Sequence, residues 1–353
     1  MAGSSIGCIF RVTTWGESHG SAIGAVVDGC PSGIVLDTAF IQSFLNRRKP
    51  GQSEFTTKRT ESDEVEILSG VFDGKTTGTP ISLIIRNRDM HFSDYDDLKD
   101  VFRPGHADYT YEMKYGIRDY RGGGRSSGRE TAARVAAGAV AMAFLRTKGI
   151  HFLTYTKSIG NITVPISDYH LAEISENSLY MPSNVYAAKA SDLIKEAVAE
   201  KNSVGGIIEG QVYDLQAGIG EPVFSKLDAE LGKAFFSIGA VKGVEFGDGF
   251  AAATMRGSEH NDAFIIKDNG ISKSTNHAGG ILGGISDGSP LVYRLAVKPT
   301  ASIAQPQNTV NNNKEAVSLN IKGRHDPCIV PRAVVVAEAM AAITIADLLL
   351  LKY

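Results

Sequence analysis

The sequence predicts an α+β protein in which antiparallel sheets pack around central helices, and three observations lead to this prediction. Two long segments repeat apolar residues at helical spacing, five shorter runs are typical of strands, and several of those runs alternate apolar and polar side chains. Such alternation indicates sheets with one buried face, which is common in antiparallel sheets. Few helices separate the strands, which disfavours a doubly wound parallel sheet.

The two strongest helices are expected in the middle and at the end of the chain. Over residues 130–149, small apolar residues recur at alternating steps of three and four, and Gly149 is a stop signal. From Pro331 onward the chain is apolar on nearly every side, so this helix is expected to be buried on most faces. The alanines of both segments should let the two helices approach closely. Two further helices are predicted at residues 186–200 and 226–235.

The strands are expected between these helices, at residues 25–27, 81–85, 206–213, 241–246 and 291–297. In the last of them, Tyr293, Leu295 and Val297 alternate with the positions between them, which indicates one buried face. No fixed-period repeat and no linker rich in Pro, Ser or Gly divides the chain. We therefore expect a single domain over residues 1–353.

Composition and charge exclude several classes of protein. Hydrophobic residues make up 43% and charged residues 21% of the chain, which excludes wholesale disorder, a collagen-like chain and a coiled coil. The net charge of −3 argues against a nucleic-acid partner. Three cysteines without a C-x-x-C pair, and an N-terminus without a signal-peptide pattern, favour a cytoplasmic setting. Glu338 and Asp347 interrupt the longest apolar stretch, so no membrane span is expected.

The strongest chemical signal is a run rich in arginine and glycine at residues 118–131. Its four arginines are separated by glycines and serines, and it leads directly into the first predicted helix. Backbone N–H groups, hydroxyls, guanidinium groups and the positive end of a helix all favour an anionic ligand. The run lacks the Gly-Lys-Ser/Thr of a Walker A loop. A phosphate or carboxylate site is predicted here, with a solvated loop or an RNA-binding segment as the alternatives.

Two histidines stand in short glycine-containing motifs. His19 lies in Gly-Glu-Ser-His-Gly, and His106 lies in Arg-Pro-Gly-His-Ala-Asp. An imidazole that titrates near neutrality can act as a general acid, and Asp108 could orient or charge His106. The adjacency of Ser18 and His19 disfavours a nucleophilic Ser-His pair. A structural role remains open for both histidines.

Three further segments are candidates for ligand binding. The basic residues 47–49 precede a Pro-Gly turn and, taken alone, are typical of a solvated surface. Paired glycines in residues 274–284, followed by Lys298 and neighbouring hydroxyls, could contact a flat ligand with a phosphate tail, although ordinary turns would also explain them. Asp326, in Gly-Arg-His-Asp-Pro, is either a helix cap or an ionised proton acceptor.

Together these motifs resemble the chorismate synthase family. The resemblance rests on Gly-Glu-Ser-His-Gly, Arg-Gly-Gly-Gly-Arg-Ser-Ser with Arg-Glu-Thr, Gly-Arg-His-Asp-Pro, Arg-Pro-Gly-His-Ala-Asp, Asn-His-Ala-Gly-Gly-Ile-Leu-Gly-Gly and Lys-Pro-Thr, in that family's order along the chain. It implies a carbon–oxygen lyase that acts on a phosphate, converting 5-enolpyruvylshikimate 3-phosphate to chorismate with reduced FMN as cofactor. It also implies a β-α-β sandwich fold, a homotetramer and a place in the shikimate pathway of aromatic amino acid biosynthesis.

The resemblance also implies roles for individual residues. His19 is similar to a histidine near the substrate phosphate, His106 to one that protonates or stabilises reduced flavin, and Asp326 to a carboxylate that assists deprotonation of the substrate ring. The positions similar to substrate-binding residues are Arg48, Arg103, Ser127, Arg129 and Arg324. The positions similar to FMN-binding residues are Arg125, Ser126, Ser127, Gly239, Ala240, Gly283, Lys298, Pro299, Thr300, Ala301, Ser302 and Arg324. No metal ligands are implied.

Three positions depart from the family pattern, and two other functions remain open. Glu54 stands where a basic residue is frequent, Gly239 where Asn is frequent and Ala301 where Ser is frequent. A flavin reductase that uses NADPH is the main alternative, and an anion- or RNA-binding module is the other. No Gly-x-Gly-x-x-Gly follows a clear strand, which disfavours a Rossmann nicotinamide site. The sequence leaves open whether the enzyme reduces its own flavin with NADPH.

Overall fold

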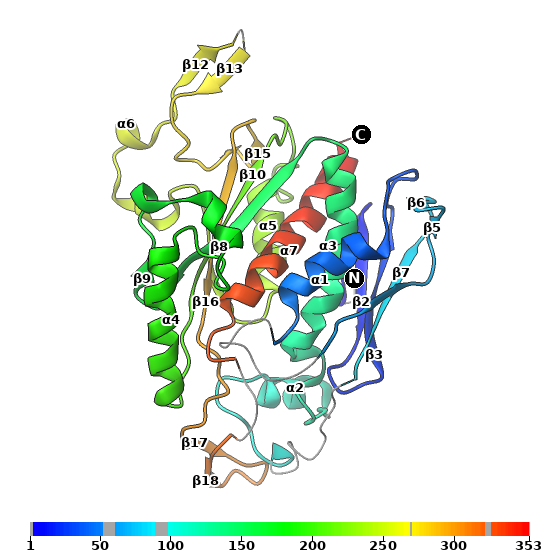
Figure 1. The fold of residues 1–353 in the computed structure, drawn as a ribbon, viewed down its shortest axis with the longest axis vertical. Helices are drawn as coiled ribbons and strands as arrows, with labels where there is room; N and C mark the ends of the chain where they lie inside the picture. Colours follow the sequence, from blue (N-terminus) through cyan, green and yellow to red (C-terminus); the bar gives the residue numbers. More distant parts are fainter. Residues whose placement is uncertain (1–2, 52–60, 89–97, 269, 322–325, 353) are drawn as a thin grey trace.

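The computed structural model describes residues 3–51, 61–88, 98–268, 270–321 and 326–352. Two five-stranded antiparallel sheets lie on either side of a layer of helices (Figure 1). The first sheet has, in spatial order, β1 (Ser5–Ile6), β2 (Arg11–Gly16), β3 (Ala22–Asp28), β7 (Ile81–Arg86) and β4 (Val65–Ile67). The second has β11 (Val241–Phe246), β16 (Leu291–Val297), β10 (Gly206–Tyr213), β8 (His151–Ile159) and β9 (Ile162–Thr163).

The helices and the small hairpins complete the described chain. The α-helices are α1 (Thr38–Arg48), α2 (Asp108–Tyr115), α3 (Thr131–Arg146), α4 (Asn184–Ala199), α5 (Leu227–Phe236), α6 (Gly257–His260) and α7 (Val330–Leu351). Short 3₁₀ turns are η2 (Gly124–Ser126), η3 (Gly128–Glu130), η4 (Ile166–Asp168), η5 (Leu171–Ser175) and η6 (Gly249–Thr254). The hairpins pair β5 (Val71–Phe72) with β6 (Lys75–Thr76), β12 (Phe264–Lys267) with β13 (Gly270–Lys273), β14 (Ile281–Leu282) with β15 (Ile285–Ser286), and β17 (Gln307–Val310) with β18 (Ala316–Leu319).

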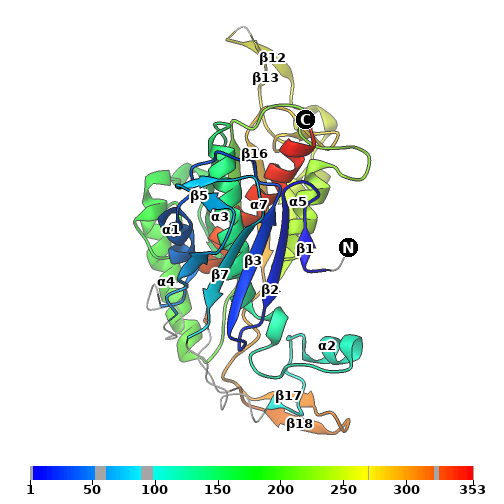
Figure 2. The ribbon, with the colours of Figure 1, turned by 90° about the vertical axis from the view of Figure 1, so that its right-hand side faces the viewer.

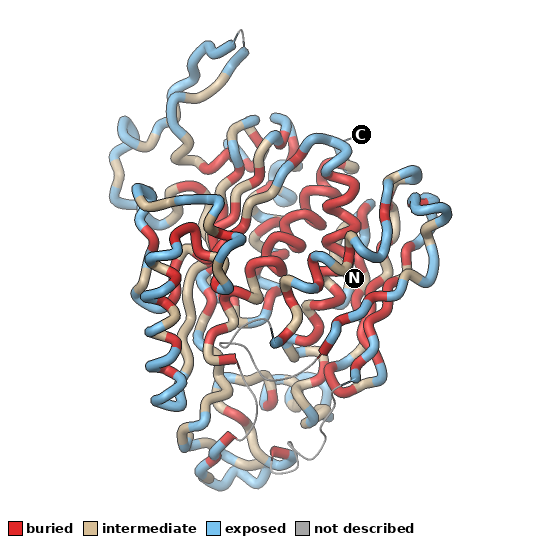
Figure 3. The backbone as a smooth tube through the Cα atoms, in the orientation of Figure 1, coloured by how far each residue is buried: buried red, intermediate tan, exposed pale blue. Residues whose placement is uncertain are grey.

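The helices α3 and α7 form the centre of the layer between the sheets. The helix α3 packs against β2, β3 and β7 of the first sheet, and α7 packs against β8 and β10 of the second. In Figure 2 the first sheet lies in front of both helices, and in Figure 3 both helices are almost entirely buried. Their small side chains let them touch closely, since a Cβ added to Gly138 would lie 2.3 Å from Cβ of Ala339. The expected antiparallel arrangement around central helices is confirmed.

Both acidic residues of α7 are buried, and each carboxylate is bound by groups from distant parts of the chain. Glu338 forms an ion pair with Arg47 of α1 at 2.7 Å between Oε1 and Nη1. The carboxylate of Asp347 accepts hydrogen bonds of 2.7–2.9 Å from the backbone N–H groups of Cys8, Ile9 and Phe10. The helix is long and apolar enough to cross a membrane, yet 83% of its most apolar 18-residue window is buried inside the structure.

Nearly all of the expected elements appear close to their predicted bounds. The four predicted helices correspond to α3, α7, α4 and α5, and the five predicted strands to β3, β7, β10, β11 and β16. In β16, every second residue from Leu291 to Val297 is buried, as the alternation indicated. No sequence pattern predicted β2, β8, α1 or α2. All three cysteines are free.

The contact between α3 and α7 predicts opposite effects for two glycine-to-alanine substitutions. Gly138→Ala should lower the free energy of unfolding by about 1–3 kcal/mol, because its Cβ would overlap the backbone and side chain of Ala339. Gly232→Ala in α5 meets no atom within 4 Å and should raise the free energy of unfolding by about 0.5–1 kcal/mol. Urea unfolding of both variants measures this difference, and equal stability of the two would contradict the close packing.

Candidate active site

A cavity of about 1160 Å³ opens at the N-terminal ends of α3 and α7. Its wall includes the arginine-rich turns η2 and η3, the segment 105–107, the loop 237–240, the segment 298–301 and the first turns of α7. Segments far apart in the sequence therefore meet at one place. The cavity is large enough for a substrate and a cofactor together.

The arginine-rich run forms one wall of this cavity and leads into α3, as predicted. Gly122 and Gly123 adopt left-handed φ angles of 71° and 84°, so the chain turns sharply before η2. The hydroxyl of Ser127 caps η3 by accepting a hydrogen bond of 3.3 Å from the backbone N–H of Arg129. The predicted residues Arg125, Ser126, Ser127 and Arg129 all line the cavity.

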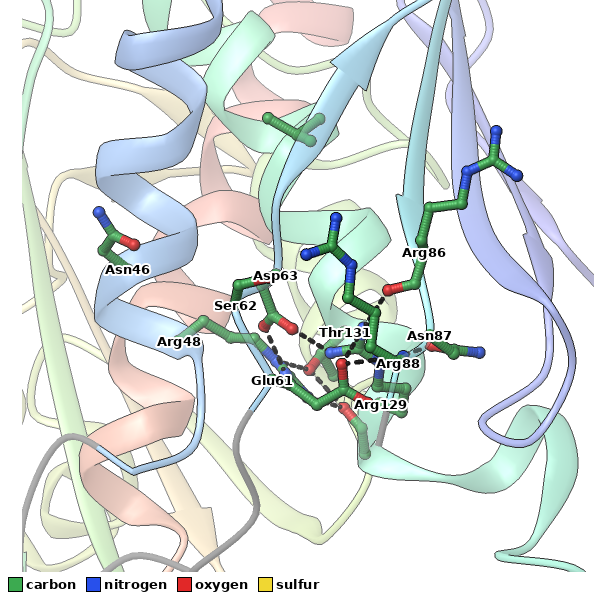
Figure 4. A network of polar contacts seen from close by, with 12 residues as sticks. Asn46, Arg48, Glu61, Ser62, Asp63, Arg86, Asn87, Arg88, Arg129 and Thr131 are labelled. Carbon is green, nitrogen blue, oxygen red and sulfur yellow. Dashed lines mark hydrogen bonds and ion pairs between the residues drawn. The ribbon is translucent and has the colours of Figure 1, made fainter. Parts of the chain in front are cut away.

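Arg48 and Arg129 reach the cavity from different elements and share one buried carboxylate, as Figure 4 shows. Nη1 of Arg48 donates to Oδ2 of Asp63 at 3.0 Å, and Nη1 of Arg129 donates to Oδ1 of the same residue. Burial, with Arg332 and Arg129 nearby, lowers the pKa of Arg48 to about 10, against the opposing effect of Asp63. The basic segment 47–49 is thus not a solvated surface, because Arg48 is buried at the cavity and Arg47 pairs with α7.

Asp326 also lines the cavity and lies beside a second arginine. Nη1 of Arg332, in the first turn of α7, donates to Oδ2 of Asp326, and Nε of Arg332 donates to the backbone carbonyl of Arg48 at 2.9 Å. The helix begins four residues later, with Ile329 as its N-cap, so Asp326 is not the helix cap. The carboxylate thus lies at the cavity in an ion pair with Arg332.

His106 lines the cavity with both ring nitrogens in hydrogen bonds. Nδ1 lies 2.9 Å from the carbonyl of Pro104, so it donates there, and Nε2 lies 2.8 Å from Oγ of Ser302. Burial and the nearby Arg103 lower the pKa of this imidazole, which favours its neutral form. Asp108 does not bond to the His106 ring. Its carboxylate is bound by the backbone and guanidinium of Arg103, at 2.8–2.9 Å.

His19 is buried directly behind the arginine-rich loop rather than in the cavity wall. Its Nδ1 lies 3.0 Å from Oγ of Ser18, and a Cβ added to Gly122 would lie 2.3 Å from the imidazole. Only a glycine therefore fits at position 122 of the loop, against this ring. The next residue, Gly123, lines the cavity. Neither Ser18 nor His19 lines the cavity, so their contact is not a nucleophilic arrangement at this site.

The positions similar to FMN-binding residues fall into three groups. Gly239, Ala240, Lys298, Pro299, Thr300 and Ala301 line the cavity beside the arginine-rich turns. Ser302 reaches it through His106, whereas Gly283, in the β14–β15 hairpin, does not line the cavity of its own chain. The hydroxyl of Thr300 is buried and has no hydrogen-bond partner within the described part of the chain, which suits a ligand. Arg324 and Glu54 lie outside the described residues.

One predicted residue is not at the site: Arg103, expected to bind substrate, is bound to Asp108 and does not line the cavity.

Two residues at or behind the cavity wall, Asp63 and Arg332, were not predicted from the sequence. Asp63 lies in an ordinary polar segment, and its two arginine partners are 15 and 66 residues away. Arg332 could have been noticed as a single basic residue in an otherwise apolar helix.

The arrangement is suited to acid–base chemistry on a multiply charged anion. Guanidinium groups supply positive charge in a buried setting, where electrostatic interactions are stronger than in water. Asp326 and His106 supply a carboxylate and a neutral imidazole on the same cavity. Anion binding and proton transfer can therefore occur side by side.

Comparisons with known proteins agree with this arrangement. The family model described as chorismate synthase matches residues 10–350. The chorismate synthase of Agathobacter rectalis is 60% identical over 352 residues, which cover 100% of this chain and 96% of the relative. That of Parabacteroides distasonis is 52% identical, covering 99% of this chain and 98% of the relative. A crystal structure of chorismate synthase aligns with a TM-score of 0.79 at 32% identity, covering 98% of this chain and 93% of that one. The chain therefore belongs to the chorismate synthase family, the carbon–oxygen lyases of the shikimate pathway.

Proposed function

We propose that the cavity binds 5-enolpyruvylshikimate 3-phosphate together with reduced FMN, and that the chain eliminates phosphate there to form chorismate. The observation that supports this most directly is the meeting of Arg48 and Arg129 with Asp326 and His106 on one cavity. The substrate has two carboxylates and a phosphate, and guanidinium groups bind such anions with charge and directed hydrogen bonds.

We assign the substrate anions to Arg48, Arg129 and Ser127. The two guanidinium groups are buried and fixed by hydrogen bonds, so little side-chain entropy is lost when an anion binds. Asp326 then accepts the proton of the substrate ring as the C–O bond to phosphate breaks with its electron pair. We also assign protonation of the departing phosphate to His19, which would have to act across Gly122 and Gly123 because its ring lies behind the arginine-rich loop, and we place His106 on the flavin side of the cavity.

The residues of the cavity fit a flavin phosphate and ring system. Arg125, Ser126, Lys298 and Thr300 offer charged and hydroxyl donors, and the open space beside Gly239 admits a flat group. Bound reduced FMN supplies the electron density that makes phosphate departure possible from a ring without an adjacent carbonyl. The protein supplies placement, charge and the sites that exchange protons.

We also propose that the enzyme acts as a cytoplasmic homotetramer. Its β12–β13 hairpin extends away from the rest of the molecule in Figures 1 and 2, with Ile266 87% and Ile271 85% exposed. A two-stranded hairpin is marginally stable in water by itself, so contact with other subunits would stabilise it. Phe224, 91% exposed in the loop before α5, is a second apolar position suited to such contact.

An anaerobic assay tests the proposed activity. The protein, reduced FMN and 5-enolpyruvylshikimate 3-phosphate, mixed without oxygen, should produce chorismate absorbance and one phosphate per chorismate. Oxidised FMN without a reductant should support no turnover. In a second mixture, NADPH and oxidised FMN replace the reduced FMN. Oxidation of NADPH there, with no phosphate released in either mixture, would contradict the proposal and favour a flavin reductase.

Substitution of the two histidines tests their roles. His19→Ala and His106→Ala should each lower turnover by about 10- to 10,000-fold, since each removes a group that transfers protons. His151→Ala, at the exposed start of β8, is the matched control and should retain full activity. Wild-type turnover in either site variant would remove the role assigned to that histidine.

The buried hydroxyl of Thr300 predicts an effect on flavin affinity. Thr300→Val keeps the side-chain shape but removes the hydroxyl, so the Kd for FMN should rise about 10-fold, the value of one hydrogen bond. Quenching of flavin fluorescence measures this Kd, and Thr163→Val on the exposed strand β9 should leave it unchanged. An unaltered Kd in Thr300→Val would place the FMN elsewhere.

A further inference from the structure

Asp63 occupies an unusual position for an aspartate. It is only 1% exposed, and its backbone has a left-handed φ of 49°, just before β4. A buried carboxylate is costly unless charged or polar groups surround it. Burial raises the pKa of Asp63, but Arg48 and Arg129 outweigh that effect and hold the pKa below its ordinary value.

The two arginines that bind Asp63 come from elements that are otherwise separate. Arg48 ends α1, where its Nε donates to Oγ1 of Thr131 at 3.1 Å and its Nη2 to the carbonyl of Gly128 at 2.7 Å. Arg129 belongs to η3, and its Nε donates to Oδ1 of Asn87 at 2.9 Å. These other hydrogen bonds have neutral acceptors, and Oε2 of the buried Glu61 lies 3.7 Å from Nη2 of Arg129. Asp63 is the anion that contacts both guanidinium groups directly (Figure 4).

The charges at this wall of the cavity require such an anion. Arg48, Arg129 and Arg332 are near enough that the latter two lower the pKa of Arg48. Two mutually repelling guanidinium groups would separate, or reach into the cavity at variable positions, without a carboxylate between them. Two further carboxylates lie at this wall, Glu61 beside Arg129 and Asp326 beside Arg332. Asp63 differs from them because it contacts both Arg48 and Arg129, and it therefore fixes their spacing.

We infer that Asp63 is a positioning residue for the substrate, because it sets the spacing of Arg48 and Arg129 so that one multiply charged anion meets both. The identity of that anion rests on the proposed function. Preorganised charge of this kind improves ligand binding, because the protein does not reorganise when the anion arrives. Asp63 contacts these arginines from behind, and its own side chain does not line the cavity.

Asp63→Asn is the variant that tests this inference. Asn has the same shape and tolerates a left-handed backbone, but it removes the negative charge and presents an N–H₂ group to one arginine. The KM for 5-enolpyruvylshikimate 3-phosphate should rise about 10- to 100-fold, with kcat within about 3-fold of wild type and the Kd for FMN unchanged. Glu66→Gln, three residues after Asp63, is the matched control. It breaks an exposed ion pair with Arg86 and should change neither constant.

A double-mutant cycle separates positioning from a general structural role. If Asp63 acts through the arginines, Asp63→Asn combined with Arg129→Gln should raise KM little more than Arg129→Gln alone. Three outcomes would each overturn the inference. They are increases in KM that multiply in the double variant, a KM of Asp63→Asn within 2-fold of wild type, and a loss in Asp63→Asn that is confined to kcat. Should Asp63→Asn unfold, Asp63→Gly suits the left-handed backbone and takes its place, with the same expectations.

Calorimetric titration with inorganic phosphate, without flavin, keeps this test independent of the proposed reaction. Wild-type protein should bind phosphate at least 5-fold more tightly than Asp63→Asn. Equal affinities, or no phosphate binding by the wild type, would overturn the inference even if chorismate is formed. A wild type that forms no chorismate but shows the phosphate difference would overturn the proposed function and leave Asp63 as the residue that positions an anion site.

Discussion

The close approach of α3 and α7 is the constraint on which the rest of the structure depends. Gly138 and Ala339 touch in the centre of the helical layer, where a larger side chain on either helix would push the two apart. Each helix starts at the cavity, α3 directly after the arginine-rich turns and α7 four residues after Asp326. The distance between the helices therefore determines the distance between the cationic loop and the carboxylate.

The buried charges of this protein tie together segments that are far apart in the sequence. Arg47 and Arg48 are adjacent, yet Arg47 pairs with Glu338 on α7 while Arg48 pairs with Asp63 ahead of β4. Removing one partner of such a pair leaves an uncompensated buried charge, which is much more costly than losing a surface ion pair. The pairs thus specify how α1, α7 and the first sheet meet, as well as stabilising them.

The sequence predicted best those elements whose residues follow a regular spacing. The helices α3 and α7 and the strand β16 were expected because their apolar residues repeat at steps that only one secondary structure explains. Strand β8 mixes threonines, tyrosine and lysine, since Tyr155 and Lys157 bond to Glu209 on β10, and this polar network conceals its alternation. Helix α1 was missed because its basic end was interpreted as a surface.

For the site, sequence reasoning found the local part and missed the part that depends on pairing. Residues 125–129 are contiguous, and their composition alone indicates an anion. The contact between Asp63 and Arg129 joins positions 66 residues apart, so no local pattern reports it. Arg103 is a different case, because Asp108 lies in the same short motif, and only the geometry of the turn shows that this carboxylate bonds to Arg103 rather than to His106.

A continuous set of contacts links Asp326, the proposed proton acceptor, to Arg48 and Arg129, the arginines proposed to bind the anion. Asp326 bonds to Arg332, Arg332 donates to the carbonyl of Arg48, and Arg48 shares Asp63 with Arg129. An anion that contacts Arg48 and Arg129 is thereby placed relative to the Asp326 carboxylate through a chain of fixed side chains. Because every link involves a guanidinium group and is at least partly buried, a small displacement at one end is costly at the other. The proposed substrate binding and proton removal would therefore depend on the same set of interactions, which accounts for the concentration of buried charges at one wall of the cavity.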